Sequence, residues 1–179
     1  MTSPPTSRPP EGPLGPGAGD RTEPEAAPVN RSILVGVDDS ANARRAVDYV
    51  ADLLGGRTDV RVHLLHVRPD PDPELDDAPS PAAKVRRIRG RRRREASLLA
   101  ECRQRLLDRG VAPGRLSTRS LDCYCPSIAD CILSEGRRLG CGTIVVGRQG
   151  RSRREEFLFG SVSSRLVGHA HGCAVWVVA

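Results

Sequence analysis

The segment Ile33-Leu-Val-Gly-Val-Asp-Asp-Ser40 decides the fold. Its first five residues are short, apolar and partly β-branched, which predicts a strand buried on both faces. Ser40 is suited to cap a following helix, in which apolar residues recur at helical spacing: Ala43, Ala46, Val47, Val50 and Leu54. The segment therefore predicts a buried strand joined directly to a helix, which is the first unit of a parallel α/β sheet.

The same alternation continues to the end of the sequence. Further strands are predicted at Val60–Val67, Leu116–Leu121, Thr143–Val146 and Ala174–Val178. Helices are predicted over roughly Arg91–Arg109, from Ser127 to Leu139, and from Ser161 to about Ala170, with a loop over Asp70–Pro81. Because crossovers between parallel strands are right-handed, this order predicts a doubly wound five-stranded parallel sheet. We expect strand order 3-2-1-4-5, with helices on both faces, in a Rossmann-like architecture.

The chain divides into a tail and one domain. Residues 1–30 hold eight prolines and almost no bulky apolar side chains, so they are predicted to be disordered. Residues 31–179 form the predicted domain. No apolar window approaches the roughly 18 residues of a membrane span, and no apolar leader suggests secretion. With six cysteines in 179 residues, a disulfide scaffold is not expected, and we predict a cytoplasmic protein.

Positive charge is concentrated in one run. The formal net charge is +6, and seven of the nine residues from Arg86 to Arg94 are arginine. Clustered arginine binds phosphate backbones, so binding of nucleic acid or an acidic surface by this run is an alternative function. However, Glu95 follows, no aromatic residues interleave, and Gly90 is expected to interrupt the helix. The favoured interpretation is a solvated loop and a frayed first helical turn, and nucleic acid is not an expected partner.

A glycine pattern follows the fourth predicted strand. Gly147 and Gly150 come directly after it, and Gly160-Ser161-Val162 opens the next helix. Glycines at the carboxyl end of a strand let backbone N–H groups approach a phosphate closely, and a helix N-terminus adds free donors. Arg148 adds positive charge. The alternative is that the glycines merely turn the chain and Ser161 merely caps a helix, and spacing alone leaves both interpretations open.

The sequence from Ser32 to Val178 resembles the universal stress protein family, of the kind that binds ATP. The family signature G-x2-G-x9-G-[ST] is met by Gly147, Gly150, Gly160 and Ser161. Three further segments match in the right order: ILVGVDDS at 33–40, LLHV at 64–67, and GSVSSRLVGHA with VWVV between 160 and 178.

The resemblance implies a nucleotide site at the carboxyl ends of the strands. The implied site residues are Val37, Asp38, Val67, Gly147, Arg148, Gly150, Gly160, Ser161 and Val162. Asp38 would lie beside ribose and adenine, Val67 would contact adenine mainly through its backbone, and the glycine loop would hold the phosphates. The implied cofactor is ATP, with Mg²⁺ as a further candidate. The expected function is regulatory: nucleotide binding changes the state of a dimer, and an unidentified protein partner recognises that state.

No motif argues for strong catalysis. A P-loop of the form G-x4-G-K-[ST] is absent from the sequence, and His169 and His171 favour a helix C-terminus rather than a general base. Whether the protein is an enzyme is left open, with slow Mg²⁺-dependent hydrolysis using Asp38 or Asp39 as the rival. The cysteines at 123, 125, 131 and 141 lack the paired spacing of zinc ligands, so no metal site is expected.

The last predicted strand, Ala174–Val178, lies at the sheet edge in the expected order. Its residues are apolar and uncharged, and an unprotected edge strand favours pairing with another strand. Pairing of two such edges about a two-fold axis would bury Trp176, and the resemblance implies the same homodimer. The alternative is that Trp176 faces a helix of its own subunit.

Overall fold

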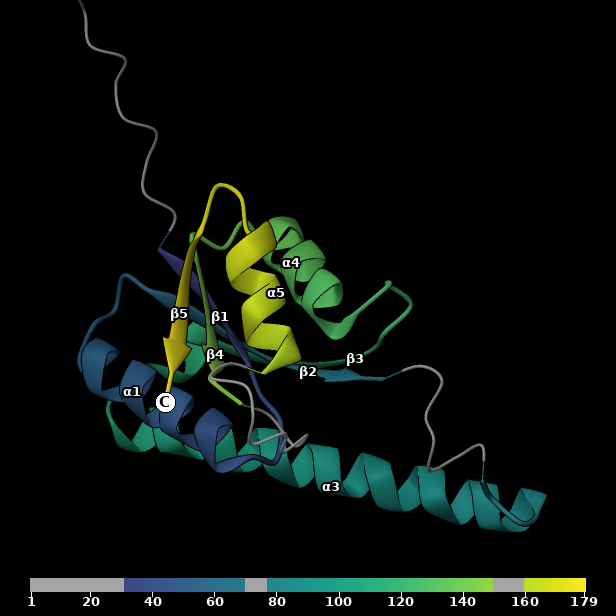
Figure 1. The fold of residues 1–179 in the computed structure, drawn as a ribbon. Helices are drawn as coiled ribbons and strands as arrows, with labels where there is room; N and C mark the ends of the chain where they lie inside the picture. Colours follow the sequence, from purple (N-terminus) through teal and green to yellow (C-terminus); the bar gives the residue numbers. More distant parts are fainter. Residues whose placement is uncertain (1–30, 70–76, 150–159) are drawn as a thin grey trace, which may run out of the picture.

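Five parallel strands form the centre of the computed structural model, which describes residues 31–69, 77–149 and 160–179 (Figure 1). Their order is β3-β2-β1-β4-β5, as predicted, and the doubly wound α/β class is confirmed. The strands are β1 (Ser32–Gly36), β2 (Arg61–Arg68), β3 (Leu116–Asp122), β4 (Thr143–Gly147) and β5 (Ala174–Val178). The predicted disordered tail, 1–30, lies outside the described residues.

Two helical layers cover the sheet (Figure 1). The helices are α1 (Ala41–Leu54), α3 (Pro81–Asp108), α4 (Ile128–Arg138) and α5 (Ser161–His169), with the short 3-10 helix η1 (Pro113–Arg115) before β3. One buried cluster joins α1 and α3 to the sheet, and a second joins α4 and α5 to the opposite face. Leu34 and Val35 are both fully buried but belong to different clusters, because successive side chains of a strand point to opposite faces.

Serine hydroxyls begin three of the helices. Ser40 Oγ accepts the Ala43 N–H at 3.1 Å, Ser80 Oγ accepts the Ala83 N–H at 3.2 Å, and Ser127 Oγ accepts the Asp130 N–H at 3.2 Å. Each bond satisfies a backbone donor that has no partner inside its helix. The cap predicted at Ser40 is confirmed.

The helix α3 differs from its prediction. It begins at Pro81 rather than near Arg91 and runs for 28 residues through the arginine run. Ser80 caps it and Pro81 occupies its first turn, a combination that favours helix initiation. Gly90 lies inside the helix, where glycine is about 1 kcal/mol less favourable than alanine but does not end it. The prediction that Gly90 interrupts the helix is therefore wrong.

Among the described residues, no helix is both long enough and apolar enough to cross a membrane.

Candidate functional site

The carboxyl ends of the central strands lie together at one edge of the sheet. In the registers, Gly36 of β1 lies beside Leu65 of β2 and Val146 of β4. The helix that follows β1 lies in one helical layer and the helix that follows β4 lies in the other. Ligands of doubly wound sheets bind at such a point, between neighbouring strands whose helices lie on opposite faces. The sequence-predicted residues Val37, Asp38 and Gly147 follow or end these strands.

The two ends of the glycine-rich segment meet at Arg148. The Arg148 carbonyl oxygen accepts the Gly160 N–H at 2.9 Å and the Ser163 hydroxyl at 2.7 Å. The Arg148 N–H donates to the Val178 carbonyl at 2.6 Å, which extends the pairing of β4 with β5. We call this arrangement the loop base. It brings the end of β4 next to the start of α5, whereas Gly150 lies outside the described residues.

The start of α5 carries no side-chain cap. Gly160 is the N-cap residue in an extended conformation, with φ −70° and ψ 161°, and no side chain of the described residues caps the N–H groups of the first turn. Ser161 is the first helical residue and is exposed, so the alternative in which Ser161 caps the helix is wrong. The N–H groups of Ser161 and Val162 precede the first intrahelical bond, which Ser164 N–H makes to Gly160 O at 3.0 Å. The helix start therefore presents donors suited to an anion.

Arg148 supplies a polar atom that lacks a partner among the described residues. Its Nε is buried and makes no hydrogen bond within residues 31–69, 77–149 and 160–179. Leaving a buried donor unpaired is unfavourable by about 1–3 kcal/mol, and more for a charged group. An anion held between the loop base and the guanidinium would satisfy this donor.

Gly147 is required by packing alone. A Cβ built at this position would lie 2.7 Å from the carbonyl carbon of Asn42 and 2.8 Å from the backbone N of Ala43. The Asn42 side chain also donates from Nδ2 to the Gln149 carbonyl oxygen at 3.0 Å. The glycine thus allows the first turn of α1 to lie against the end of β4, which positions the loop base.

The predicted nucleoside-binding residues lie at the carboxyl ends of β1 and β2, beside the loop base. Asp38 Oδ1 accepts the Ser40 N–H at 3.1 Å and the Ser40 hydroxyl at 2.5 Å, so the carboxylate is oriented by its own turn. Val37 packs in the cluster beneath α1 and α3, whereas Val67 packs in the cluster beneath α4 and α5. Both side chains are buried. Only their backbones are therefore left to line the carboxyl end of the sheet.

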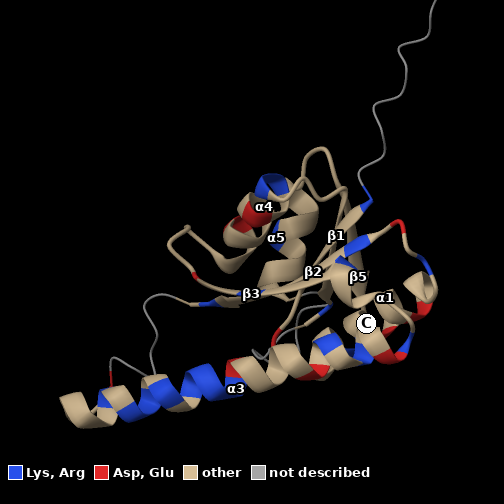
Figure 2. Cartoon of the chain, turned by 180° about the vertical axis from the view of Figure 1, so that it is seen from behind, with Lys and Arg blue, Asp and Glu red and all other residues tan. Residues whose placement is uncertain are grey.

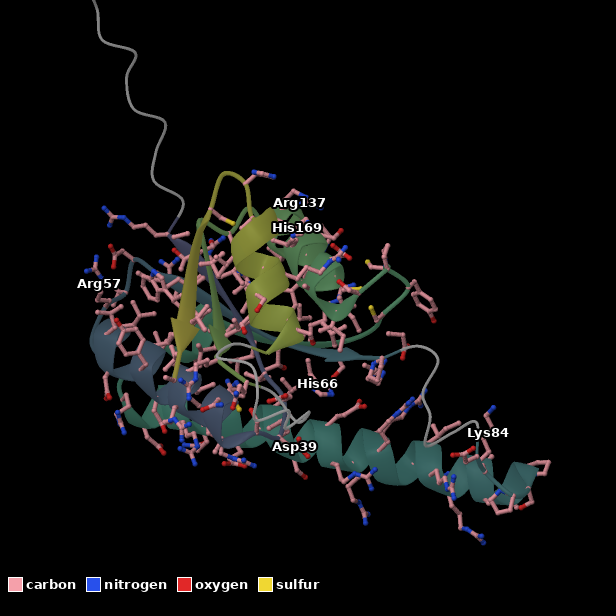
Figure 3. All side chains as sticks on the ribbon, viewed as in Figure 1. Asp39, Arg57, His66, Lys84, Arg137 and His169 are labelled. Atoms are coloured by element: carbon pink, nitrogen blue, oxygen red, sulfur yellow. The ribbon has the colours of Figure 1, made fainter. Side chains whose placement is uncertain are left out.

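His66 has no role predicted from the sequence, although it belongs to the LLHV segment. Its Nδ1 lies 2.8 Å from the Val37 carbonyl oxygen. Because a carbonyl oxygen only accepts, Nδ1 carries the proton and donates it. His66 and Asp39 lie at the same end of the sheet (Figure 3). The signal that could have found His66 is its place one residue before a predicted adenine contact.

A charged network fixes the end of β2 to its neighbours. Arg68 donates Nε to Asp122 Oδ1 at 2.6 Å and Nη2 to Asp122 Oδ2 at 2.9 Å. Its Nη1 donates to Glu95 Oε2 at 2.8 Å, and the Glu95 side chain is only 8% exposed. The bond to Arg68 lowers the pKa of Asp122, and the same bond raises the pKa of Arg68. This network joins α3 and β3 to the edge that carries the site.

Two cysteines lie together in the buried cluster beneath α4 and α5, Cys123 and Cys131. Cys131 lies in the apolar stripe of α4, and its Sγ is 3.0 Å from Cys123 Sγ. Burial raises the pKa of the Cys131 thiol. Tyr124, between Cys123 and Cys125, is 84% exposed. Within the described ranges, no group of three or more His, Cys, Asp or Glu side chains is placed to hold a metal ion.

Together, the fold and the loop base define a doubly wound α/β protein whose carboxyl edge is suited to an anionic ligand. A model of the universal stress protein family matches residues 30–179, and the chain belongs to this family. The resemblance stated from the sequence is thus confirmed at the level of the family. Among curated protein sequences, no match was found.

Solved structures of universal stress proteins share the fold. The protein from Burkholderia pseudomallei is 25% identical, with 85% of this chain and 98% of that chain covered and a TM-score of 0.60. The protein UspA from Lactobacillus plantarum is 22% identical, with 84% and 98% covered and a TM-score of 0.65.

Two similar structures contain a nucleotide. One is a universal stress protein from Archaeoglobus fulgidus in complex with dAMP, 18% identical, with 84% of this chain and 99% of that chain covered and a TM-score of 0.56. The other is a universal stress protein in complex with cAMP, 17% identical, with 84% and 97% covered and a TM-score of 0.57.

Proposed function

We propose that this protein binds an adenine nucleotide, with ATP as the ligand, at the carboxyl edge of β1, β2 and β4. The observation that carries the proposal is the loop base, which holds the uncapped start of α5 against the end of β4. The Arg148 Nε, which has no hydrogen-bond partner in the described part of the chain, lies in the same segment. Family membership and the two relatives solved with dAMP and cAMP support an adenine ligand.

Each site residue has a role in this proposal. The N–H groups of Ser161 and Val162 and the Ser161 hydroxyl donate to phosphate oxygens, and Arg148 adds a positive charge. Gly160 keeps the approach to these donors free of a side chain. The Asp38 carboxylate accepts ribose hydroxyls, and Val67 meets the adenine through its backbone. Where Mg²⁺ accompanies the phosphates, the oxygen atoms of Asp38 and Asp39 are suitable ligands.

Binding, rather than turnover, is the proposed activity. No lysine of the described residues lies on the loop base, because the single lysine, Lys84, lies far out on α3 (Figure 3). Hydrolysis is therefore proposed to be slow at most. The protein would act in the cytoplasm as a homodimer formed through β5. Nucleotide binding would change the state of this dimer, and a protein partner would recognise the changed state in a response to stress.

The test compares two glycine variants of α5. Gly160→Val adds a branched side chain at the proposed phosphate contact, and its extended backbone conformation tolerates valine. Gly168→Val is the control, because a Cβ at Gly168 meets nothing within 4 Å. We expect Gly160→Val to abolish ATP binding in calorimetry, whereas Gly168→Val retains it.

Thermal unfolding provides the second readout. Saturating ATP, at about 100 times its dissociation constant, should stabilise the wild-type protein by about 2.7 kcal/mol. AMP and cAMP, measured alongside ATP, would define the preferred phosphate chain. A wild-type protein that shows neither heat of binding nor a thermal shift with any of these nucleotides contradicts the proposal.

A further inference from the structure

The N-terminal half of α3, residues 81–94, projects beyond the rest of the domain at the carboxyl end of the sheet (Figure 1). We call this segment the basic arm. From Lys84 to Arg94 it contains no buried residue, and Ala83 is the only buried residue in it. The second half of α3 instead buries Leu98, Leu99 and further apolar residues against the sheet. The arm therefore contributes almost nothing to the core of its own domain.

Basic residues follow one another along the projecting part of α3, where the ribbon is mostly coloured for Lys and Arg (Figure 2). Arg86, Arg89 and Arg93 are exposed and follow at intervals of three and four residues, so they share one face of the helix. This face spans about 10 Å along the axis. Arg89 and Arg93 are like charges at i and i+4, which destabilises a helix by a few tenths of a kcal/mol. An anionic surface laid along this face would remove that repulsion.

Part of the arm's positive charge lies beside carboxylates. Arg91 pairs with Glu95 at 3.5 Å. Asp77 lines an open hollow of about 580 Å³ with Arg87, Gly90 and Arg94, and Arg86 of the exposed face also lines this hollow. By contrast, Arg89 and Arg93 form no ion pair with any residue of the described ranges. The surplus positive charge is thus directed outward.

The basic arm is anchored to the rest of the domain. Glu95, directly after the last arginine of the run, accepts Arg68 Nη1 at 2.8 Å. Further along α3, Arg105 Nη1 donates to Asp48 Oδ2 of α1 at 2.9 Å. These bonds and the buried half of α3 fix the direction of the helix, and the Ser80 cap closes its free end. A preorganised helix binds with less loss of conformational entropy than a disordered basic segment.

The chemistry of the arm selects the partner. An interfacial membrane helix needs a face of bulky apolar residues, but the arm between Lys84 and Arg94 has only Val85 and Ile88. Single-stranded nucleic acid is held by aromatic stacking, and the arm has no aromatic residue. A row of exposed arginines along a rigid helix matches the closely spaced phosphates of a duplex. We propose that the basic arm binds the phosphate backbone of duplex nucleic acid, largely independent of sequence.

The test measures binding of the full chain to a short, labelled, mixed-sequence DNA duplex by fluorescence anisotropy. The variant Arg86→Gln/Arg89→Gln/Arg93→Gln removes three charges from the exposed face. The control Arg61→Gln/Arg115→Gln/Arg137→Gln removes the same charge from residues at the start of β2, in η1 and near the end of α4. We expect the arm variant to bind about tenfold or more weakly, whereas the control stays close to the wild type.

Salt dependence separates binding to phosphates from a general charge effect. For the wild type, the logarithm of the affinity should fall linearly with the logarithm of salt concentration. The arm variant should reduce this slope by about 0.9 for each phosphate that it no longer neutralises. Equal losses of affinity in the arm variant and the control would overturn the proposal. So would tighter binding to phosphatidylserine vesicles or to single strands than to the duplex. None of these measurements requires ATP, so failure here is distinct from failure of the nucleotide site.

Discussion

Gly147 shows how a single missing Cβ joins the fold to the site. The glycine at the end of β4 suggests close approach of a phosphate when only the sequence is considered, yet the backbone of Asn42 and Ala43 already fills the space that a Cβ would need. We predict that Gly147→Ala destabilises the protein by about 1–3 kcal/mol through overpacking. Urea-induced unfolding measures the change.

A second glycine provides the control. Gly168→Ala in α5 meets no atom within 4 Å and should stabilise the helix by about 0.5–1 kcal/mol. A Gly147→Ala variant as stable as the wild type would show that α1 moves away from β4 at little cost, and that Gly147 has another purpose.

Glu135 links stability to pH. Its side chain is 6% exposed and accepts Arg138 Nε at 2.8 Å and Arg119 Nη1 at 2.9 Å. The bond to Arg138 is the main cause that lowers the pKa of Glu135. A carboxyl with a lowered native pKa stabilises the fold above its unfolded pKa of about 4.3, and the contribution is lost as pH falls through the lowered value.

We therefore predict that Glu135→Gln destabilises the protein at neutral pH and that its difference from the wild type shrinks in acid. Unfolding free energies measured between about pH 7 and pH 3 test this. Glu101→Gln, which alters an exposed carboxylate, should give a small difference throughout. A difference between the wild type and Glu135→Gln that is constant over this range would contradict the linkage.

At the scale of elements, α3 is anchored by one buried carboxylate. Glu95 is 8% exposed and bonds Arg68, whereas Glu101 on the same helix is 42% exposed and bonds Arg44 and Arg105. Loss of a hydrogen bond to a buried charge is unfavourable by about 1.5–3 kcal/mol, but an exposed ion pair contributes about 0–1 kcal/mol. We predict that Glu95→Gln is the more destabilising of the two in urea unfolding. Equal effects would mean that α3 is held by its apolar stripe alone.

The sequence predicts α3 to be shorter than it is, because its N-terminal half is missed. The sequence predicts its buried half, because Leu99, Cys102 and Leu106 recur at helical spacing. The arm carries no apolar periodicity, so its helicity follows instead from the Ser80-Pro81 start and from continuity with the anchored half. A prediction that gave the Ser80 cap more weight than Gly90 would have found the helical arm.

The strand ends are more predictable than the contacts between them. Buried parallel strands give long apolar runs, so the order of elements and the positions of Asp38, Val67 and Gly160 at one edge follow from the sequence. The bond from Gly160 to Arg148, the contact of Gly147 with α1, and the bond of His66 to Val37 join residues far apart in the sequence. Spacing carries no signal for such contacts, which depend on how the layers pack.

For the whole molecule, β5 combines an internal packing role with an edge position. Trp176 packs against Tyr49 of α1, with ring centroids 6.0 Å apart at 86°, so its side chain faces a helix of its own subunit, and the pairing of two β5 edges stays a prediction. The edge position of β5 is confirmed. Ala174 N–H donates to Gly142 O, and Val178 O accepts from Arg148 N–H. Because strand residues alternate, Val175 and Val177 direct their backbone groups away from β4.

This alternation gives a selective test of the homodimer that we propose through β5. Val177→Pro removes an outward-facing N–H while leaving the bonds between β4 and β5 in place. Val177→Ala keeps the N–H and shortens the same side chain, so it is the matched control. We predict that light scattering shows a dimer for the wild type and for Val177→Ala, and a folded monomer for Val177→Pro. A wild-type monomer at micromolar concentrations, or a Val177→Pro dimer, would place the interface elsewhere, because two antiparallel edges cannot pair fully without this donor.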